Sequence, residues 1–386
     1  MYCLRVLVLA GGVLATPSLV WADTRVVFTV DVESNEIRLP DQVNAVCADG
    51  AHCGLMEIAR LLQERHWSGT FFLNVYEHKQ WGERAMRDIA VGLQEADQDV
   101  ALHTHPQWAY DPNRWAMFQY NLDDQTTIVR DGVRLLQAWT GRPVVAHRAG
   151  AYTADEHTLI ALERNGVLLD SSLFWQYPNN RLDTTTLPRN VPGNYGRVRE
   201  IPVTVYLRED RPGVLQTVFD PVTVVRKIDP NWFINEAEMR AAIDAAVASD
   251  LPVLVVFFHS FSFMGGGAPG SRLADRHAIE MFHAMLDHVA QKHLKVVSMR
   301  DLADEDITRT EPAARDLVPR VTMNIGIPRY AWGRLKASRT SSRAVGAALT
   351  ILLAGAALVV ARRGWKKARS TAASSRTSVT SGVRLR

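Results

Sequence analysis

Residues 25–33 read Arg-Val-Val-Phe-Thr-Val-Asp-Val-Glu, a short β-rich run that ends in two acidic residues. A run of this length that is rich in β-branched residues is typical of a buried strand, which we expect to cover Arg25–Asp31. Runs of the same kind follow at residues 70–75, 99–104, 143–147, 167–170, 199–205, 252–258 and 294–298. Helical patterns separate most of these runs, and strands that alternate with helices predict a parallel sheet.

The helical patterns have apolar residues at the spacing i, i+3, i+4, i+7, beginning at Leu55, Met86 and Met239. Thr153, followed three residues later by Glu156, predicts a capping box that opens another helix. About eight strand–helix units favour an α/β fold of the distorted (β/α) barrel type, with 7–8 strands, over a doubly wound sheet. The sequence has no glycine-rich dinucleotide motif after its first strand and no phosphate loop.

The composition of the chain limits the classes of protein to which it can belong. Its 386 residues are 47% hydrophobic and 22% charged, which excludes a mini-protein and a wholly disordered chain. The net charge of +3 is uneven, because the tail 362–386 holds eight basic residues and no acidic one. With Arg5 also set aside, residues 6–361 carry a net charge of −6. An acidic bulk argues against a nucleic acid as a partner.

Both ends of the chain resemble membrane signals. The uncharged apolar run 6–20 lies behind Arg5 and before a small-residue site at Ala22, which predicts a signal peptide over residues 1–22. A retained N-terminal anchor is the alternative. Residues 344–361 contain no charge and would form a helix of about 27 Å, which predicts one transmembrane helix.

The basic cluster after that helix places the tail 362–386 in the cytoplasm. We therefore expect a single-pass protein of the cell membrane, with a domain at residues 23–305 on the periplasmic or cell-surface side. Residues 306–343 contain Pro, Arg and Ser with little periodicity, and we expect them to be a juxtamembrane linker.

Two cysteines remain once the signal is removed. Cys47 and Cys53 lie six residues apart among turn residues, and in an oxidising compartment such a pair can form a disulfide. Zinc binding by this pair with His52 is the alternative, although no second Cys/His pair follows at the spacing of a zinc finger.

Polar residues gather where five of the predicted strands end. In a (β/α) barrel these ends meet at the face that carries the active site. The residues are Asp31 and Glu33, His103 and His105, His147 and Arg148, Asp170, and His259. Residues two apart in a strand share a face, so Asp31 with Glu33, and His103 with His105, can point into one cavity. Two imidazoles with one or two carboxylates match the ligands of a catalytic zinc or similar divalent ion. His147 is either an extra ligand or a packing residue.

These motifs resemble those of the polysaccharide deacetylase (NodB-homology) family, in the family's order and over residues 24–305. The matching segments are Thr29-Val-Asp31-Val-Glu33, His103-Thr-His105, Arg148-Ala-Gly-Ala-Tyr152 and the strand that ends in His259. The resemblance implies a distorted (β/α) barrel and metal-dependent removal of N- or O-acetyl groups from carbohydrates. The family's second motif normally has two histidines four residues apart, whereas position 107 is Gln here.

The resemblance also implies roles for individual residues. Asp31 would be the general base, Arg148 would pair with it, and His259 would be the general acid. Asp170 matches the fourth motif loosely and would raise the pKa of His259. The backbone N–H of Tyr152 would face the oxyanion, with Ala151 where the family usually has Pro. The metal ligands would be Glu33, His103 and His105, and the metal would be zinc or another divalent ion.

Aromatic residues in the loops after these motifs suit sugar rings, and we expect Trp108 and Trp175 to contact the substrate. The reading favoured by the sequence is a membrane-tethered deacetylase of a surface or exported polysaccharide, or of a peptidoglycan-like glycan. Two alternatives remain open. One is a hydrolase of the same fold that cleaves another amide, ester or glycosidic bond, and the other is a catalytically degenerate glycan-binding or assembly protein.

Overall fold

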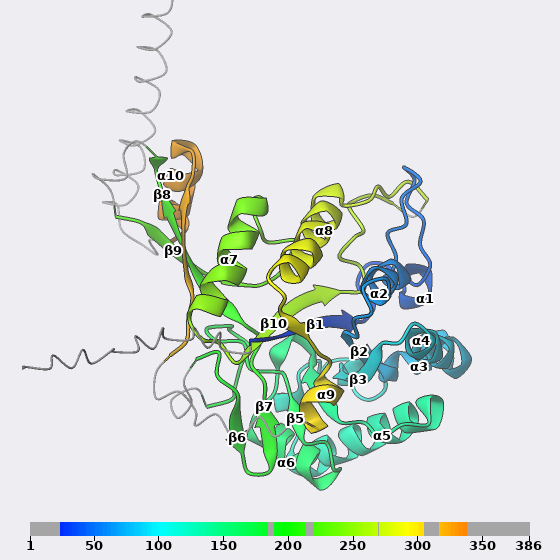
Figure 1. Cartoon of the computed structure of the whole chain (residues 1–386). Helices are drawn as coiled ribbons and strands as arrows, with labels where there is room; N and C mark the ends of the chain where they lie inside the picture. The colour runs from blue at the N-terminus through cyan, green and yellow to red at the C-terminus, as the bar shows by residue number, and fades with distance from the viewer. Residues whose placement is uncertain (1–23, 184–188, 214–219, 269, 305–315, 338–386) are drawn as a thin grey trace, which may run out of the picture.

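The computed structural model of the chain describes residues 24–183, 189–213, 220–268, 270–304 and 316–337. Its centre is a curled, mostly parallel sheet with the strand order β10-β1-β2-β3-β4-β5-β7-β6, to which β11 adds beside the start of β1 (Figure 1). The strands are β1 (Arg25–Val32), β2 (Thr70–Asn74), β3 (Asp99–Thr104), β4 (Ala146–Ala149), β5 (Leu169–Asp170), β6 (Gly193–Tyr195), β7 (Val198–Glu200), β10 (Val253–His259) and β11 (Lys295–Val296). Within the described ranges β10 and β6 form the two ends of this path, so the barrel is open.

A second, three-stranded sheet lies beside the barrel. It has the order β12-β8-β9 and consists of β8 (Val205–Arg211), β9 (Val222–Lys227) and β12 (Arg320–Asn324). Backbone bonds connect it to the barrel, because Phe257 N–H in β10 donates to Ile228 O directly after β9. The end of β9 is therefore held against the barrel strand that ends in His259.

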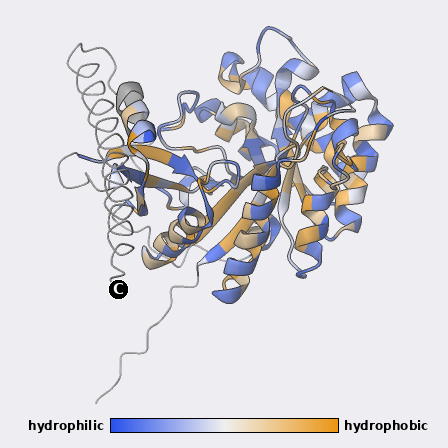
Figure 2. Ribbon diagram, turned by 90° about the horizontal axis from the view of Figure 1, so that it is seen from above, coloured by the Kyte–Doolittle hydropathy of each residue, from blue (hydrophilic) through white to orange (hydrophobic). Residues whose placement is uncertain are grey.

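The helices are α1 (Leu39–Gln42), α2 (Leu55–Gln63), α3 (His78–Trp81), α4 (Glu83–Glu95), α5 (Leu122–Thr140), α6 (Glu156–Arg164), α7 (Glu236–Ala248), α8 (Arg276–Gln291), α9 (Met299–Asp304) and α10 (Ile327–Ala337). Most of the helices cover the outer face of the main sheet, whereas α9 packs against its inner apolar residues and α10 lies on the second sheet (Figure 1). Figure 2 shows apolar strands at the centre and helices whose surfaces mix apolar and polar residues. Side-chain caps begin three of the longer helices: Asn121, Asn235 and Asp275 each accept a bond from a backbone N–H in the first turn.

The inner face of the barrel is filled by alternate strand residues. Val27, Phe72, Ala101, Ala146 and Val255 form one apolar cluster, which also contains residues of α9. Because side chains alternate between the two faces of a strand, the residues two and four positions further along point to the same side. The inner face is therefore apolar near the start of the strands and polar at their carboxyl ends, where the mouth of the barrel lies.

Two elements differ from the predicted pattern for local reasons. The run 199–205 divides into β7 and the start of β8, because Pro202 lies between them and has no N–H to donate. The helix expected to open at Thr153 begins instead at Glu156, with Asp155 as its cap. Thr153 is unavailable as a cap, since its hydroxyl donates to Gly150 O and accepts from Met117 N–H.

The stretch expected to be a linker, residues 306–343, contains regular structure. β12 pairs in parallel with β8, and the Tyr330 hydroxyl of α10 donates to Asp220 O. Tyr330 is fully buried. β12 and α10 are both held by contacts with the second sheet. Their local sequence patterns do not show these contacts.

The predicted signal peptide 1–22 and transmembrane helix 344–361 lie outside the described residues. Among the helices that are described, none has the length and apolar character needed to cross a membrane.

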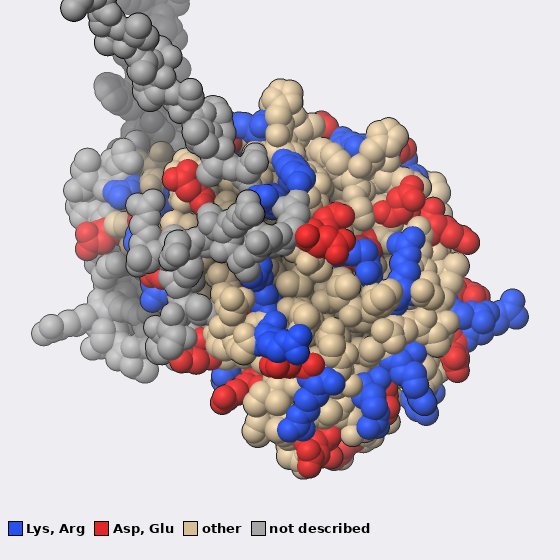
Figure 3. All heavy atoms as spheres, turned by 60° about the horizontal axis from the view of Figure 1, so that its bottom comes forward, with Lys and Arg blue, Asp and Glu red and all other residues tan. Residues whose placement is uncertain are grey.

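Near the barrel's mouth, Cys47 and Cys53 are joined by a disulfide, with a Cα–Cα distance of 6.0 Å. Ala48 N–H donates to Arg272 O, which connects the disulfide loop to the loop after β10. The face shown in Figure 3 carries acidic and basic side chains interspersed with one another.

Candidate active site

Six of the predicted site residues meet at the mouth of the barrel. They lie at inward-facing positions, either at the ends of four strands or directly after them. They are Asp31 and Glu33 from β1, His103 and His105 from β3, Arg148 from β4 and His259 from β10. The register brings them together, since Asp31 pairs with His259 and His103 pairs with Arg148 across neighbouring strands.

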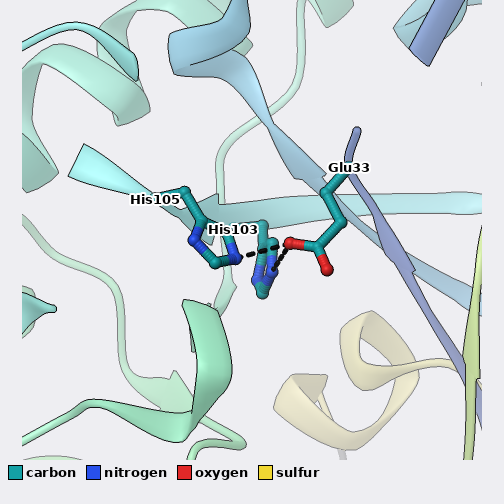
Figure 4. A group of neighbouring side chains, drawn as sticks. All are labelled: Glu33, His103 and His105. Atoms are coloured by element: carbon teal, nitrogen blue, oxygen red, sulfur yellow. Dashed lines mark hydrogen bonds and ion pairs between the residues drawn. The ribbon is translucent and has the colours of Figure 1, made fainter. Parts of the chain in front are cut away.

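Glu33, His103 and His105 form the tightest group (Figure 4). Glu33 Oε2 lies 2.5 Å from His105 Nε2 and 3.3 Å from His103 Nε2. One ligand atom from each of the three residues lies within 4.8 Å of the other two. The Glu33 backbone is fixed by the Ser260 hydroxyl, which donates to Glu33 O, and by the Gln42 amide, which donates to the same oxygen.

The donor set of this group fits a divalent metal ion. His103 Nδ1 lies 2.9 Å from Arg148 O, and because a carbonyl only accepts, Nδ1 carries the hydrogen. In the neutral tautomer this leaves the lone pair of Nε2 directed at a carboxylate oxygen of Glu33, and a cation between the two atoms, either a proton or a metal ion, makes that contact favourable. His105 Nε2 is buried, and its contact with Glu33 Oε2 lacks the geometry of a hydrogen bond. Two imidazole nitrogens and one carboxylate are the ligands that catalytic zinc takes.

The charges of this group are coupled. Burial opposes the charged form of Glu33, but His105 and His103 outweigh it and hold the pKa of Glu33 well below its ordinary value. Burial likewise opposes a charged His105, but Glu33 outweighs it and raises the pKa of His105. The carboxylate is thus ionised at neutral pH and available as a ligand.

Asp31 and Arg148 form a buried ion pair beside this group. Arg148 is fully buried, and its Nη1 donates to Asp31 Oδ1 at 2.8 Å. Its other bonds go to the Thr29 hydroxyl and to both the backbone oxygen and the hydroxyl of Ser171. The guanidinium also lies over the ring of Phe72, at 4.3 Å. One orientation of the Asp31 carboxylate is fixed by this arrangement, as the resemblance predicts.

His259 lies on the opposite side of Glu33, with Nε2 3.6 Å from Glu33 Oε1. Its ring stacks on Phe261, with the centroids 4.6 Å apart. Burial lowers the pKa of His259 below its ordinary value, and Lys227 adds to this effect, although Glu33 opposes it. The ring is therefore neutral at neutral pH.

The expected pairing of Asp170 with His259 is wrong. Asp170 instead accepts from the buried His147, at 2.7 Å from Nδ1, and the Thr104 hydroxyl lies 3.0 Å from His147 Nε2. The reason is strand alternation: Asp170 and His147 each precede an inward-facing residue by one position, so both side chains point to the other face of the sheet. His147 is accordingly a packing residue and not a ligand.

The aromatic residues also differ in part from the expectation. Tyr152 lines the cavity, and it and Ala151 both have positive φ, 59° and 48°, which bends the backbone sharply at the cavity edge. Trp108 and Trp175 do not line the cavity. Trp108 packs against Trp81 at 6.0 Å, and Trp175 lies under the Arg189 guanidinium at 4.2 Å.

The cavity in front of these residues has a volume of about 450 Å³, within the range typical of ligand sites. Its far wall contains residues that the sequence reasoning missed, above all Lys227, Asp229 and Trp232 from the end of β9 and the turn after it. Lys227 Nζ lies 3.4 Å from Asp229 Oδ2 and 3.3 Å from the ring centroid of Phe257.

The segment 222–227 is mixed in polarity and was not among the expected strands. The sequence feature that could have indicated this wall of the cavity is the Asp-Pro-Asn turn at residues 229–231.

No family model and no curated protein matches the chain. Three solved structures to which it is similar are a candidate polysaccharide deacetylase from Mycobacterium smegmatis, a CE4 family pseudoenzyme from Bacillus anthracis, and a family 4 carbohydrate esterase from Streptomyces lividans in complex with acetate. In that order, the sequence identities are 18%, 13% and 10%, and the TM-scores are 0.46, 0.38 and 0.37. The matches cover 79%, 74% and 72% of this chain and 95%, 67% and 92% of the other chains.

Proposed function

We propose that this protein is a metal-dependent deacetylase that removes acetyl groups from an acetylated polysaccharide. The observation that supports this best is the meeting of three chemical functions in one cavity. They are a carboxylate oriented by a buried guanidinium (Asp31 with Arg148), a set of metal ligands, and an imidazole on the opposite side (His259). Hydrolysis of an amide or ester needs a base, stabilisation of negative charge on the carbonyl oxygen, and an acid for the leaving group.

Glu33, His103 and His105 would hold the metal ion, and the donor set favours zinc. A divalent ion bound there would lower the pKa of water and polarise the substrate carbonyl. Asp31 would accept a proton from the attacking water, in the orientation that Arg148 fixes. His259 would donate a proton to the leaving nitrogen or oxygen. Because its pKa is lowered, His259 would carry that proton only under mildly acidic conditions or after gaining it during the reaction.

The bent backbone at Tyr152 supports a role for its N–H group. Successive residues of left- and right-handed conformation direct N–H groups toward an anion, and Tyr152 is left-handed whereas Thr153 has φ −87° and ψ 21°. This N–H would stabilise the oxyanion, as the family resemblance implies.

The walls of the cavity suit a sugar. Phe174 and Tyr177 are stacked at 4.9 Å, and Trp232 lies 6.5 Å from Phe174, so flat aromatic faces border the polar groups. Aromatic faces bury the apolar side of a pyranose ring, and the carboxylates nearby can accept bonds from its hydroxyl groups.

We also propose that the domain lies outside the cytoplasm, anchored to the cell membrane. The supporting observations are the apolar run 6–20, the uncharged stretch 344–361 and the basic tail 362–386. The disulfide between Cys47 and Cys53 is typical of proteins in oxidising compartments.

The test is acetate release by the purified full-length protein from defined glycans, N-acetylated and O-acetylated, with zinc, cobalt or manganese and with a chelator. We expect metal-dependent release of acetate, and loss of that release in Asp31→Asn. If the protein binds zinc but releases no acetate from any glycan that it binds, the catalytically degenerate alternative is favoured. If sugar is released instead of acetate, the protein is a different hydrolase.

A further inference from the structure

Gln107 lies directly behind the imidazole of His105. The chain turns tightly here, because Pro106–Trp108 forms a 3-10 turn in which Trp108 N–H donates to His105 O. This turn brings the Gln107 side-chain amide back to His105, with Nε2 3.3 Å from His105 Nδ1. The other end of the amide, Oε1, is buried and has no hydrogen-bond partner among the described residues.

The orientation of this amide decides which nitrogen of His105 can bind a metal. With the amide nitrogen toward the ring, His105 Nδ1 must accept, so the neutral ring carries its hydrogen on Nε2. That hydrogen would lie between Nε2 and Glu33 Oε2, which are 2.5 Å apart, at the position that the metal needs. With the amide oxygen toward the ring, Nδ1 carries the hydrogen and donates it, and Nε2 presents its lone pair beside Glu33.

In the same site, His103 has the second of these arrangements, with its hydrogen on Nδ1. Its Nδ1 donates to Arg148 O, a group that can only accept, so its Nε2 is fixed as a potential ligand. His105 has no backbone carbonyl as a partner for Nδ1 among its described hydrogen bonds, and Gln107 occupies that place. An imidazole ligand in proteins generally donates its second N–H to such an outer partner, which fixes the ring and its tautomer.

We propose, building on the metal site of the proposed function, that Gln107 is the positioning residue of His105. In the metal-bound site its amide is turned by 180° from the orientation described above, and Oε1 accepts from His105 Nδ1–H. The rotation gives the buried oxygen a partner, and it directs the Nε2 lone pair toward Glu33 and His103. Gln107 is thus not a ligand itself but selects the tautomer in which His105 can be one.

The test measures zinc affinity in the full-length protein, by competition with a chromophoric chelator, and does not depend on activity. Gln107→Leu keeps the bulk but removes the acceptor, and it should weaken zinc binding by about 10- to 100-fold. Gln107→Glu supplies an oxygen that always accepts, and it should bind zinc within about tenfold of the wild type or more tightly. Gln291→Leu, the same change at an exposed position of α8, is the matched control and should leave the affinity unchanged.

A second measurement follows the hydrogen itself. In zinc-loaded protein labelled with ¹⁵N-histidine, the Nδ1–H of His105 should exchange slowly with solvent in the wild type and in Gln107→Glu, and rapidly in Gln107→Leu. The Nδ1–H of His103 is bonded to Arg148 O and should stay protected in all of them. This measurement also reports on any fraction of Gln107→Leu that remains folded.

The inference is overturned if Gln107→Leu binds zinc as tightly as the wild type, or if Gln107→Glu loses as much affinity as Gln107→Leu. It is also overturned if zinc is bound through His105 Nδ1. Failure of the proposed function gives a different result, because a wild-type protein that binds zinc through His105 but releases no acetate leaves the role of Gln107 intact.

Discussion

A single methyl group at Gly150 should disable the site. A Cβ built at Gly150 would lie 2.3 Å from Nε2 and 2.4 Å from Cε1 of His105, whereas ordinary contacts begin at 3.4 Å. The His105 ring in Gly150→Ala would therefore have to retreat by about 1 Å. Metal–ligand distances tolerate deviations of only about 0.2 Å, so a displaced Nε2 ceases to be a ligand. Gly150 does not have positive φ, which means that the effect is steric and not a backbone strain.

We expect Gly150→Ala to weaken zinc binding by at least about 100-fold and to reduce acetate release in parallel. The assay is chelator competition, with the melting temperature measured on the same samples. Gly92→Ala in α4 is the matched control, because a Cβ there meets nothing within 4 Å, and it should leave zinc binding unchanged. It should also stabilise the fold by about 0.5–1 kcal/mol, since alanine is the better helix former. A folded Gly150→Ala protein with wild-type zinc affinity would show that His105 is not a ligand.

Other changes test other parts of the molecule. Asp31→Asn should retain zinc yet lose at least about 100-fold in turnover, because it removes a general base, and loss of zinc instead would make Asp31 a ligand. Since the pKa of His259 is lowered and an acid must be protonated, the alkaline limb of kcat/KM should lie below the ordinary histidine pKa, and His259→Ala should remove that limb. An unchanged limb in His259→Ala with a lowered melting temperature would make the residue structural. Replacing Cys47 and Cys53 by Ser opens a disulfide ring between residues six apart and should lower the free energy of unfolding by about 2 kcal/mol, as measured by denaturant titration. An unchanged free energy would show that the ring is not closed in the native protein. Protease added to intact cells, with any outer membrane permeabilised, should digest the domain, and a protected domain would contradict the proposed topology.

Most strands of the barrel were predictable from local sequence because they are short, buried runs rich in β-branched residues, whereas β6, a partly exposed Gly-Asn-Tyr segment paired with β7, was not among the expected strands. The predicted strand 99–104 coincides with β3, and 25–31 falls one residue short of β1. The second sheet was not predictable in this way. β9 and β12 are partly exposed strands whose side chains alternate in polarity only weakly. Both are ordered by pairing with β8, which for β12 lies far away in the sequence.

The site residues fall into the same two groups, those that the local sequence predicts and those that depend on the second sheet. Alternation along a strand places Asp31 with Glu33, and His103 with His105, and this much needs no structure. The same rule, applied from strand to strand, also excludes Asp170 from the cavity, because it lies next to the inward-facing Ser171. Asp229 lies in the turn after β9 of the second sheet, and its place in the same cavity as His259 depends on the backbone bond from β10 to Ile228.

The charges around the cavity fall into two balanced pairs and one carboxylate without a fixed cation. Asp31 is paired with Arg148, and Asp229 is paired with Lys227. Among the described residues, the cationic partners within ion-pair distance of Glu33 are all imidazoles, those of His103, His105 and His259. A largely buried carboxylate is costly unless a positive charge compensates it, and the imidazole of His103, whose Nδ1 donates to Arg148 O, turns Nε2 toward this carboxylate. The site therefore has room for one more positive charge, between Glu33 and the two imidazoles of β3. Because the pairs on either side are already neutral, the charge of a divalent ion held there would be only partly cancelled by Glu33. The remainder would face the open cavity, where the carbonyl oxygen of a bound acetyl group would gain negative charge.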